Sequence, residues 1–291
     1  MNKKILRKIL QQGGIISLLI KRFLKTLVKN KIYNFKISTL IEFNLTERPH
    51  YLYCVYHAAI LAQRLGLKKI SVIEFGVAGG NGILFLESFA KNIKTETGVE
   101  IEIYGFDLGT GLVEPKDYRD LPYWFKKDLY KMDHSSLNSK IKYTKLIIGD
   151  VKNTIKEFFK IYNPAPVGVI LNDLDYYSST INSFEIFKTG EDKFYLPRIF
   201  CYFDDVIGTE NEMYGKDNGQ LLAINEFNNS NLGKKINLNQ NLLNSNTPYK
   251  FQIYYFHNYD HVDYNKFIFS SEQIRMSENL KIIKSNKKVM R

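Results

Sequence analysis

Acidic residues stand at the ends of five short apolar segments, and this placement is the most informative chemical feature of the sequence. The apolar segments span residues 70–75, 101–106, 145–148, 167–171 and 199–203. The acids at their ends are Glu74, Asp107, Asp150, Asp173 with Asp175, and Asp204 with Asp205. Solubility requires no particular position for its charges, so this regular placement indicates a binding or catalytic site. If the segments are parallel strands, their carboxyl ends meet at one sheet edge, where open α/β folds bind ligands.

A glycine-rich turn follows the first apolar segment. Residues 73–82 read Ile-Glu-Phe-Gly-Val-Ala-Gly-Gly-Asn-Gly, and small residues let a backbone approach a ligand closely. The spacing E-x-G-x-A-x-G differs from the G-x-G-x-x-G of dinucleotide-binding enzymes. An acid before the turn suits a cationic amino-acid ligand better than a pyrophosphate.

This turn resembles the loop of the class I S-adenosylmethionine-dependent methyltransferases that passes under the methionine and ribose parts of the cofactor. The resemblance implies that Gly76, Ala78 and Gly80 form the loop. It also implies that Glu74 lies near the amino group of the cofactor. S-adenosylmethionine is therefore the expected cofactor.

Two further acids extend the resemblance. Asp107, which ends a Tyr-Gly-Phe-Asp segment, would accept the two ribose hydroxyl groups, since a carboxylate offers paired acceptors. Asp150, within Ile-Ile-Gly-Asp-Val, matches the acid that meets the adenine amino group. The alternative for each acid is that its carboxylate caps the helix that follows.

A second motif lies at the ends of the fourth and fifth apolar segments. Residues 172–180 read Asn-Asp-Leu-Asp-Tyr-Tyr-Ser-Ser-Thr, and residues 202–206 read Tyr-Phe-Asp-Asp-Val. Together they resemble the macrocin O-methyltransferase family, in which a D-x-D segment and a following Asp pair hold a magnesium ion. The resemblance implies that Asp175, Asp204 and Asp205 bind Mg²⁺ or another divalent cation. Asp173 would support the cofactor or the metal ligands.

A metal at these acids would serve methyl transfer to oxygen. A sugar hydroxyl is a poor nucleophile unless a hard cation polarises it, lowers its pKa and fixes its position. Three carboxylates at neighbouring strand ends would repel one another without a cation. The alternative is that Asp204 and Asp205 open a turn and that Asp175 caps a helix beginning near Ser178.

An insertion at residues 111–140 separates the second and third apolar segments, and we expect it to cover the substrate. Its aromatic stretch, Asp-Tyr-Arg-Asp-Leu-Pro-Tyr-Trp at 117–124, offers rings that stack on a sugar or pack against the domain. His134 is a candidate general base, since a histidine accepts a proton near neutral pH. The alternative is that His134 is a surface residue. Asp175 and His134 are thus the candidate catalytic residues.

Apolar segments alternate with helical segments from residue 50 onward, a pattern typical of βαβ units. The sequence predicts an α/β fold with a Rossmann-like, doubly wound, mostly parallel seven-stranded sheet, helices on both faces and an N-terminal helical extension. We assign residues 1–48 to the extension and 49–291 to the catalytic domain. Helices are expected at 57–67, 82–92, 154–162, 180–187 and 220–228, an Asn-rich loop at 225–246, and a closing antiparallel pair at 249–256 and 266–269.

The formal charge of +11 comes from the two ends of the chain. Residues 1–31 hold nine Lys or Arg and residues 281–291 hold five, with no acid in either segment, which leaves 27 basic and 30 acidic residues between them. The slight excess of acids in this central part of the chain disfavours nucleic acid as a partner. The basic, amphipathic N-terminus suits peripheral contact with an anionic membrane, or packing on the catalytic domain or on a second subunit as a homo-oligomer.

These observations predict a metal-assisted O-methyltransferase that acts on a hydroxyl of a small-molecule or saccharide acceptor, such as a surface polysaccharide or a secondary metabolite. We expect a cytoplasmic protein, since the two cysteines show no paired spacing and no cleavable signal is evident. Two other functions stay open. A nicotinamide-dependent oxidoreductase or epimerase would require the missing G-x-G-x-x-G and a Tyr-x-x-x-Lys pair. A catalytically silent scaffold would not need these acids.

Overall fold

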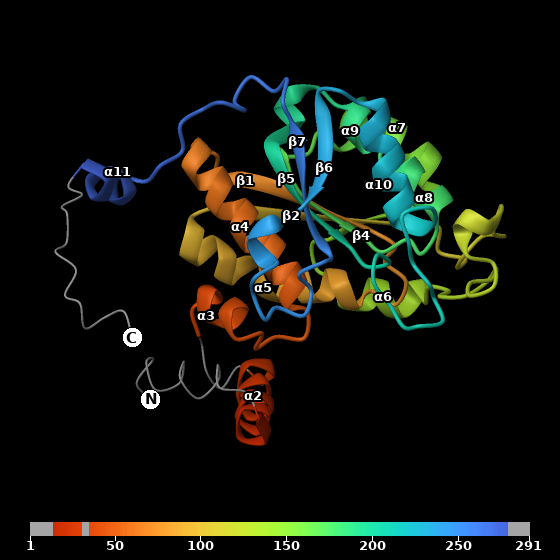
Figure 1. Cartoon of the computed structure of the whole chain (residues 1–291), viewed down its shortest axis with the longest axis horizontal. Coiled ribbons are helices and arrows are strands. Elements are labelled where there is room, and N and C mark those ends of the chain that lie inside the picture. The colour runs from red at the N-terminus through yellow and green to blue at the C-terminus, as the bar shows by residue number, and fades with distance from the viewer. Residues whose placement is uncertain (1–13, 31–34, 279–291) are drawn as a thin grey trace.

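A mostly parallel sheet forms the centre of the protein. In the computed structural model, which describes residues 14–30 and 35–278, seven strands pair in the order β3-β2-β1-β4-β5-β7-β6 (Figure 1). The first five are parallel, while β7 runs antiparallel to both β5 and β6. This confirms the predicted fold class. The strands are β1 Lys69–Phe75, β2 Glu100–Asp107, β3 Lys145–Ile148, β4 Val167–Asn172, β5 Tyr195–Phe203, β6 Lys234–Leu238 and β7 Ile253–Asn258.

The order of the strands reverses between β1 and β4. Strand β1 pairs with β2 on one side and with β4 on the other, and Phe75 lies opposite both Phe106 and Asn172. The loops that leave β1 and β4 therefore turn to opposite faces of the sheet and leave a crevice between them, the usual place for a ligand in a doubly wound fold. The acids at the strand ends border this crevice.

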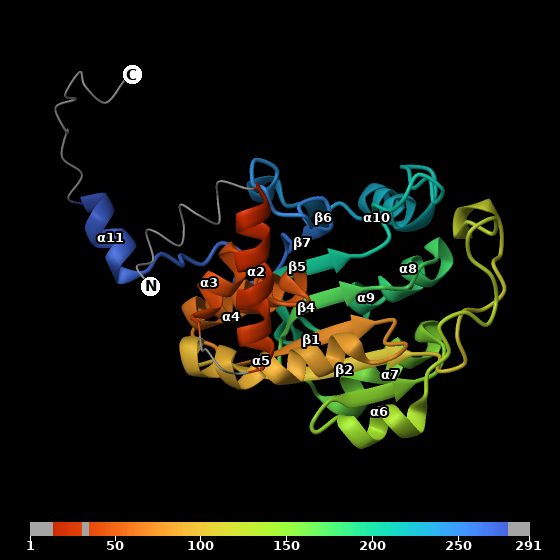
Figure 2. The same cartoon turned by 90° about the horizontal axis from the view of Figure 1, so that it is seen from below.

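Helices cover both faces of the sheet (Figures 1 and 2). One face carries α3 Ile37–Glu42, α4 Pro49–Leu65 and α5 Asn81–Thr97, and the other carries α7 Val151–Tyr162, α8 Tyr177–Ser183, α9 Ile186–Thr189 and α10 Gly219–Ser230. The remaining α-helices of the described residues are α2 Gly14–Lys29, α6 His134–Lys140 and α11 Ser271–Glu278. Helix α11 lies apart from the body in both views.

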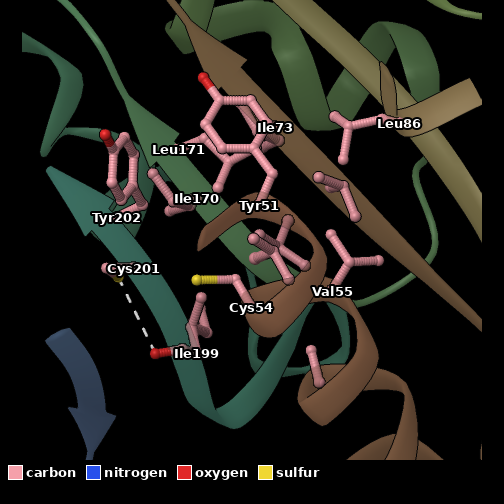
Figure 3. Close-up of a cluster of buried hydrophobic side chains, with 14 of the residues drawn as sticks. Tyr51, Cys54, Val55, Ile73, Leu86, Ile170, Leu171, Ile199, Cys201 and Tyr202 are labelled. Atoms are coloured by element: carbon pink, nitrogen blue, oxygen red, sulfur yellow. Dashed lines mark hydrogen bonds between the residues drawn. The ribbon is translucent and has the colours of Figure 1, made fainter. Parts of the chain in front are cut away.

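Helix α4 packs against the centre of the sheet. Tyr51, Cys54 and Val55 on this helix are buried, and they point toward side chains of β1, β4 and β5 (Figure 3). Both Cys54 and Cys201 are buried and free. Proline at the first helical position and a left-handed glycine at the end fix the bounds of α4. The start of this helix thereby lies beside the crevice, eight residues earlier than the apolar pattern predicts.

The predicted closing pair is wrong in its second member and in the order of its strands. Strand β6 comes from residues that the sequence assigns to the Asn-rich loop, and it pairs with β7 at the sheet edge. An edge strand buries little, and only Ile236 is buried in β6, so its Lys-Lys-Ile-Asn-Leu pattern gives a weak signal. Residues 266–269 form no strand, and Phe267 and Phe269 are exposed.

The N-terminal extension contributes to the same core as the sheet. Leu24 on α2 and Ile37 on α3 are buried in it, so the division at residue 48 stays a prediction. On α2, Ile15 and Phe23 are 78% and 63% exposed, and contact of this face with a membrane or a second subunit also stays a prediction. Residues 1–13 lie outside the described residues. Within the described part of the chain, no helix has both the length and the apolar character needed to cross a membrane.

Candidate active site

A cavity of about 430 Å³ lies at the carboxyl ends of β1, β2, β4 and β5. The glycine-rich loop, the start of α4 and the segment that follows β2 complete its walls. Among the described residues that line it, the acids are Glu74, Asp107, Asp173, Asp175, Asp204, Asp205 and Glu212. Six of these seven are acids that the sequence places at strand ends. The cavity is therefore strongly anionic.

The glycine-rich loop fits the cavity because side chains are missing at particular positions. Gly76 has φ +83°, and a Cβ there would lie 1.7 Å from the backbone oxygen of Asp173. A Cβ on Gly82 would lie 1.9 Å from Oε1 of Glu74. Gly76 and Ala78 line the cavity, whereas Gly80 is the N-cap of α5 and faces Leu137. Close approach of β1 to β4 thus depends on Gly76.

We expect Gly76→Ala to destabilise the protein far more than Gly66→Ala. Both glycines have left-handed φ, +83° and +86°, but a Cβ on Gly66 would meet nothing within 4 Å. Strain alone costs about 1–2 kcal/mol, whereas the clash at Gly76 should bring the loss in unfolding free energy to at least about 3 kcal/mol. Urea unfolding of the two variants measures the difference. Equal losses would mean that the loop tolerates displacement.

Asp107 holds the glycine-rich loop. Its Oδ2 accepts hydrogen bonds from the backbone N–H of Val77 and of Ala78, both at 2.8 Å, and its Oδ1 accepts one from Gly109 at 2.6 Å. The side chain also lines the cavity. Its contact with a ribose stays a prediction, while the anchoring of the loop is a role that the sequence did not indicate.

Glu74 is a buried acid with one unused oxygen. The hydroxyl of Tyr51 donates to its Oε1 at 2.9 Å, and its buried Oε2 has no hydrogen-bond partner among the described residues. Burial raises the pKa of Glu74 to about 7, and the charge of Asp107 adds to the rise, while Tyr51 and Arg48 oppose it. Glu74 thus lines the cavity as an acid that can still gain a cationic partner.

The raised pKa of Glu74 predicts a pH-dependent stability difference between wild type and Glu74→Gln. With a folded pKa of about 7 against an ordinary value of 4.5, the folded state holds the proton more tightly. Stability is therefore lost as the pH rises from 4.5 through 7. At pH 8 this loss amounts to about 3 kcal/mol, and the neutral Gln avoids it.

Urea unfolding of both proteins at pH 5 and at pH 8 measures this difference. We expect Glu74→Gln to gain relative to wild type at the higher pH. A stability difference that is the same at both pH values would contradict the shifted pKa.

The carboxylates beyond β4 and β5 interact with one another. Oδ2 of Asp205 accepts a hydrogen bond from the backbone N–H of Asp175 at 3.0 Å, and its Oδ1 accepts one from Tyr214. Burial raises the pKa of Asp205, and the charges of Asp175 and Asp204 raise it further. Burial likewise raises the pKa of Asp175, with added repulsion from Asp173 and Asp204. The four acids form one repelling cluster.

The chemistry of this donor set fits a hard divalent cation, which takes carboxylate oxygens. Asp175, Asp204 and Asp205 all line the cavity. In the described residues, however, no three His, Cys, Asp or Glu side chains stand ready around one point that an ion could occupy. One of these carboxylates already has hydrogen-bonding partners, since Tyr202 and Gln252 both donate to Oδ1 of Asp204.

The insertion after β2 is pinned to α8 by a buried acid. Asp120 accepts hydrogen bonds from the backbone N–H and the hydroxyl of Ser178, at 2.8 and 2.9 Å. The Asp120 carboxylate thus caps the first turn of α8, although Asp120 is far from that helix in the sequence. Trp124 and Tyr130 of the insertion line the cavity, and the role of the insertion as a cover for the substrate stays a prediction.

Besides Gly80, two predicted site residues lie outside the cavity wall. Asp150 is exposed and caps α7, accepting from the backbone N–H of Lys152 at 2.9 Å, the alternative that the sequence left open. His134 is exposed at the start of α6, and a Cβ on Gly109 would lie 2.5 Å from its Nε2. The adenine contact of Asp150 and the catalytic role of His134 stay predictions.

Arg48 and Tyr51 belong to the site although the sequence did not indicate them. Arg48 lines the cavity, and Tyr51 reaches Glu74 from the first turn of α4. Neither residue stands in a recognisable motif. The only signal near them is Pro49, which is typical of a helix start.

Solved structures provide the comparison with known proteins. No protein-family profile matches the chain, and no curated protein sequence matches it. The calicheamicin methyltransferase CalS11 has a TM-score of 0.50 and 15% identity, with 84% of this chain and 93% of that chain covered. The O-methyltransferase NovP has a TM-score of 0.47 and 11% identity, with 70% and 77% covered. The likeness to CalS11 shows that this chain has a methyltransferase fold, which confirms the predicted class I resemblance at the level of the fold.

Proposed function

We propose that the protein is an S-adenosylmethionine-dependent O-methyltransferase that acts on a hydroxyl of a small or sugar-like acceptor. The observation that carries the proposal is the acid-lined cavity in which the glycine-rich loop meets the acids of β1, β2, β4 and β5. S-adenosylmethionine carries a sulfonium and an ammonium group, so an anionic cavity suits it. The methyltransferase fold supports the same conclusion.

The cofactor half of the cavity lies along β1 and β2. Glu74 has a free buried oxygen that suits the ammonium group, and Gly76 and Ala78 offer a backbone that a ligand can approach closely. Asp107 keeps about one lone pair, on Oδ1, beyond the three amides that it binds, and this suits a ribose hydroxyl. We therefore assign these four residues to the methyl donor.

The acceptor half lies between the insertion and the acids of β4 and β5. Trp124 and Tyr130 line this half, and aromatic rings suit a sugar ring or another small acceptor. Asp175 faces the same space. The acceptor oxygen would attack the methyl carbon as the carbon–sulfur bond breaks, S-adenosylhomocysteine would leave, and the hydroxyl proton would pass to the Asp175 carboxylate.

Asp175, Asp204 and Asp205 would hold a divalent cation in this proposal. When bound, such a cation polarises the acceptor hydroxyl and lowers its pKa. Mutual repulsion of the buried acids supports the assignment, because a cation relieves it. The three side chains must turn toward a common ion for it to bind. Asp173, between β4 and these ligands, would support the cofactor.

Calorimetric titration with S-adenosylhomocysteine, run in parallel with NADH and with and without magnesium, tests the proposal. We expect one site per chain for S-adenosylhomocysteine and no binding of NADH. Binding of NADH alone would favour the oxidoreductase alternative. Absence of binding for both ligands in a folded sample would contradict a methyltransferase and favour a silent scaffold.

A further inference from the structure

Arg48 is the one cationic side chain among the described residues that line the cavity. Among the described residues that line the cavity, seven are acids, and no Lys, His or other Arg accompanies Arg48. An anionic group of a bound ligand would therefore be attracted by one side chain among these residues, that of Arg48. Arg48 lies at the start of α4, next to β1 and Glu74.

The guanidinium of Arg48 keeps its hydrogen-bonding capacity free for a ligand. It lies 4.9 Å from the centre of the Tyr51 ring, and the charges of Glu74 and Asp173 act on it. It forms no hydrogen bond within 3.5 Å and no ion pair within 4.0 Å with any described residue. An arginine that is partly buried normally pairs its donors, which fit a carboxylate two at a time.

A second unused group stands beside it. Tyr51 contacts both partners, since its ring lies under the Arg48 guanidinium and its hydroxyl donates to Oε1 of Glu74 at 2.9 Å. The other oxygen of Glu74 is buried without a partner. Tyr51 thus contacts both a guanidinium without a hydrogen-bonding partner and a carboxyl group with one unused oxygen, among the described residues of the cavity wall. A pair of this kind complements a ligand that carries both an ammonium and a carboxylate.

We propose that Arg48 binds the carboxylate of the amino-acid part of the methyl donor, while Glu74 faces its ammonium group. The inference rests on the proposed function, since it takes the donor to be S-adenosylmethionine. Any ionised acid of this cavity would repel a carboxylate, and Arg48 offsets that repulsion where the amino-acid end lies. Arg48 is in this account a determinant of selectivity for a donor with an intact amino acid.

A different role for Arg48 would be to balance the charges of Glu74 and Asp173. Removal of Arg48 would then weaken every ligand of the cavity to a similar degree, because the wall itself would change. Binding through the carboxylate instead predicts a loss confined to ligands that have one. A pair of ligands that differ only in the carboxylate separates the two roles.

The test is calorimetric titration of wild type, Arg48→Ala and Arg48→Gln with S-adenosylhomocysteine and with its decarboxylated analogue, which keeps the adenosine, the sulfur and the ammonium group. Loss of a charged hydrogen-bonding partner predicts an affinity for S-adenosylhomocysteine that falls about 10- to 100-fold in both variants. The affinity for the analogue should change less than about twofold. Arg64→Ala is the matched control, because Arg64 is exposed in the last turn of the same helix.

Equal losses for the two ligands in both variants would overturn the inference in favour of charge balance, and unchanged affinities would overturn it outright. The Gln variant keeps the size and polarity of the side chain if Arg48→Ala fails to fold. A wild type that binds neither ligand would contradict the proposed function itself, and the inference would fall with it. A wild type that binds both ligands equally would contradict only the inference.

Discussion

Replacement of Asp107 by alanine is expected to lower the affinity for S-adenosylhomocysteine by about 100-fold or more. Two effects combine in this loss. The ribose hydroxyls lose their acceptor, and the backbone N–H groups of Val77, Ala78 and Gly109 lose the carboxylate that holds the loop. Each unsatisfied donor costs about 1–3 kcal/mol where it is buried. Calorimetry measures the affinity, and urea unfolding measures the accompanying loss of stability.

Asp263→Ala is a suitable control for this variant. Asp263 follows β7, whose end pairs with the start of β5, so it lies at the end of the sheet away from the cavity. Its side chain forms an exposed ion pair with Lys266. Its removal should leave the affinity within about twofold of wild type. An Asp107→Ala protein that binds S-adenosylhomocysteine as well as this control does would rule out Asp107 as a cofactor residue.

The double variant Asp204→Asn with Asp205→Asn should lose all response to magnesium and yet be more stable than wild type in chelator. The change at Asp205 removes a charge from a place where burial and neighbouring acids oppose it, a gain on the order of 1–3 kcal/mol. In wild type, magnesium at 100 times its dissociation constant should add about 2.7 kcal/mol to the free energy of unfolding. The variant should show no such addition.

Thermal and urea unfolding of both proteins, with magnesium and with chelator at pH 8, give these four stabilities. A metal site predicts that the variant is more stable than wild type in chelator but gains nothing from magnesium. A cluster with only a structural role predicts no effect of magnesium on either protein. An equal response to magnesium in the variant and in wild type would place the ion elsewhere. A variant less stable than wild type in chelator would show that the hydrogen bonds of Asp205 to Asp175 and Tyr214 outweigh the repulsion.

The parallel part of the sheet could be predicted because its strands are buried on both faces. Strands β1 and β4 have no exposed residue, so each appears in the sequence as a mostly apolar run, interrupted in β1 by Ser71, with an acid at or near its end. Strand β6 lies at an edge and buries only Ile236. Its pattern is mostly polar, and the prediction of a loop there was wrong. The core strands could be predicted from the sequence mainly because they are buried on both faces, and less because of their strand propensity.

The site could be predicted only where its residues belong to strand ends. Asp173, Asp175, Asp204 and Asp205 line one cavity, as the common edge of parallel strands requires. Contacts between distant segments gave no signal. Asp107 reaches back thirty residues to Val77, and Asp120 crosses to Ser178. Such contacts depend on how loops pack, which residue spacing along the chain does not reveal.

Arg48 illustrates the same limit at the cavity wall. It precedes Pro49, and the helix that begins there carries the residue to the crevice beside β1. A single arginine before a helix has no spacing that relates it to Glu74, so its position follows from the packing of α4 on the sheet (Figure 3).

Hydrogen–deuterium exchange with and without saturating S-adenosylhomocysteine locates the bound cofactor on the chain, and so shows whether it occupies this cavity. A cofactor bound in this cavity should slow exchange in peptides that cover residues 76–82 and 107–113, and leave exchange unchanged in β7 and in the edge strand β6. Protection confined to another region, or no protection at a concentration that saturates binding, would contradict a cofactor site in this cavity.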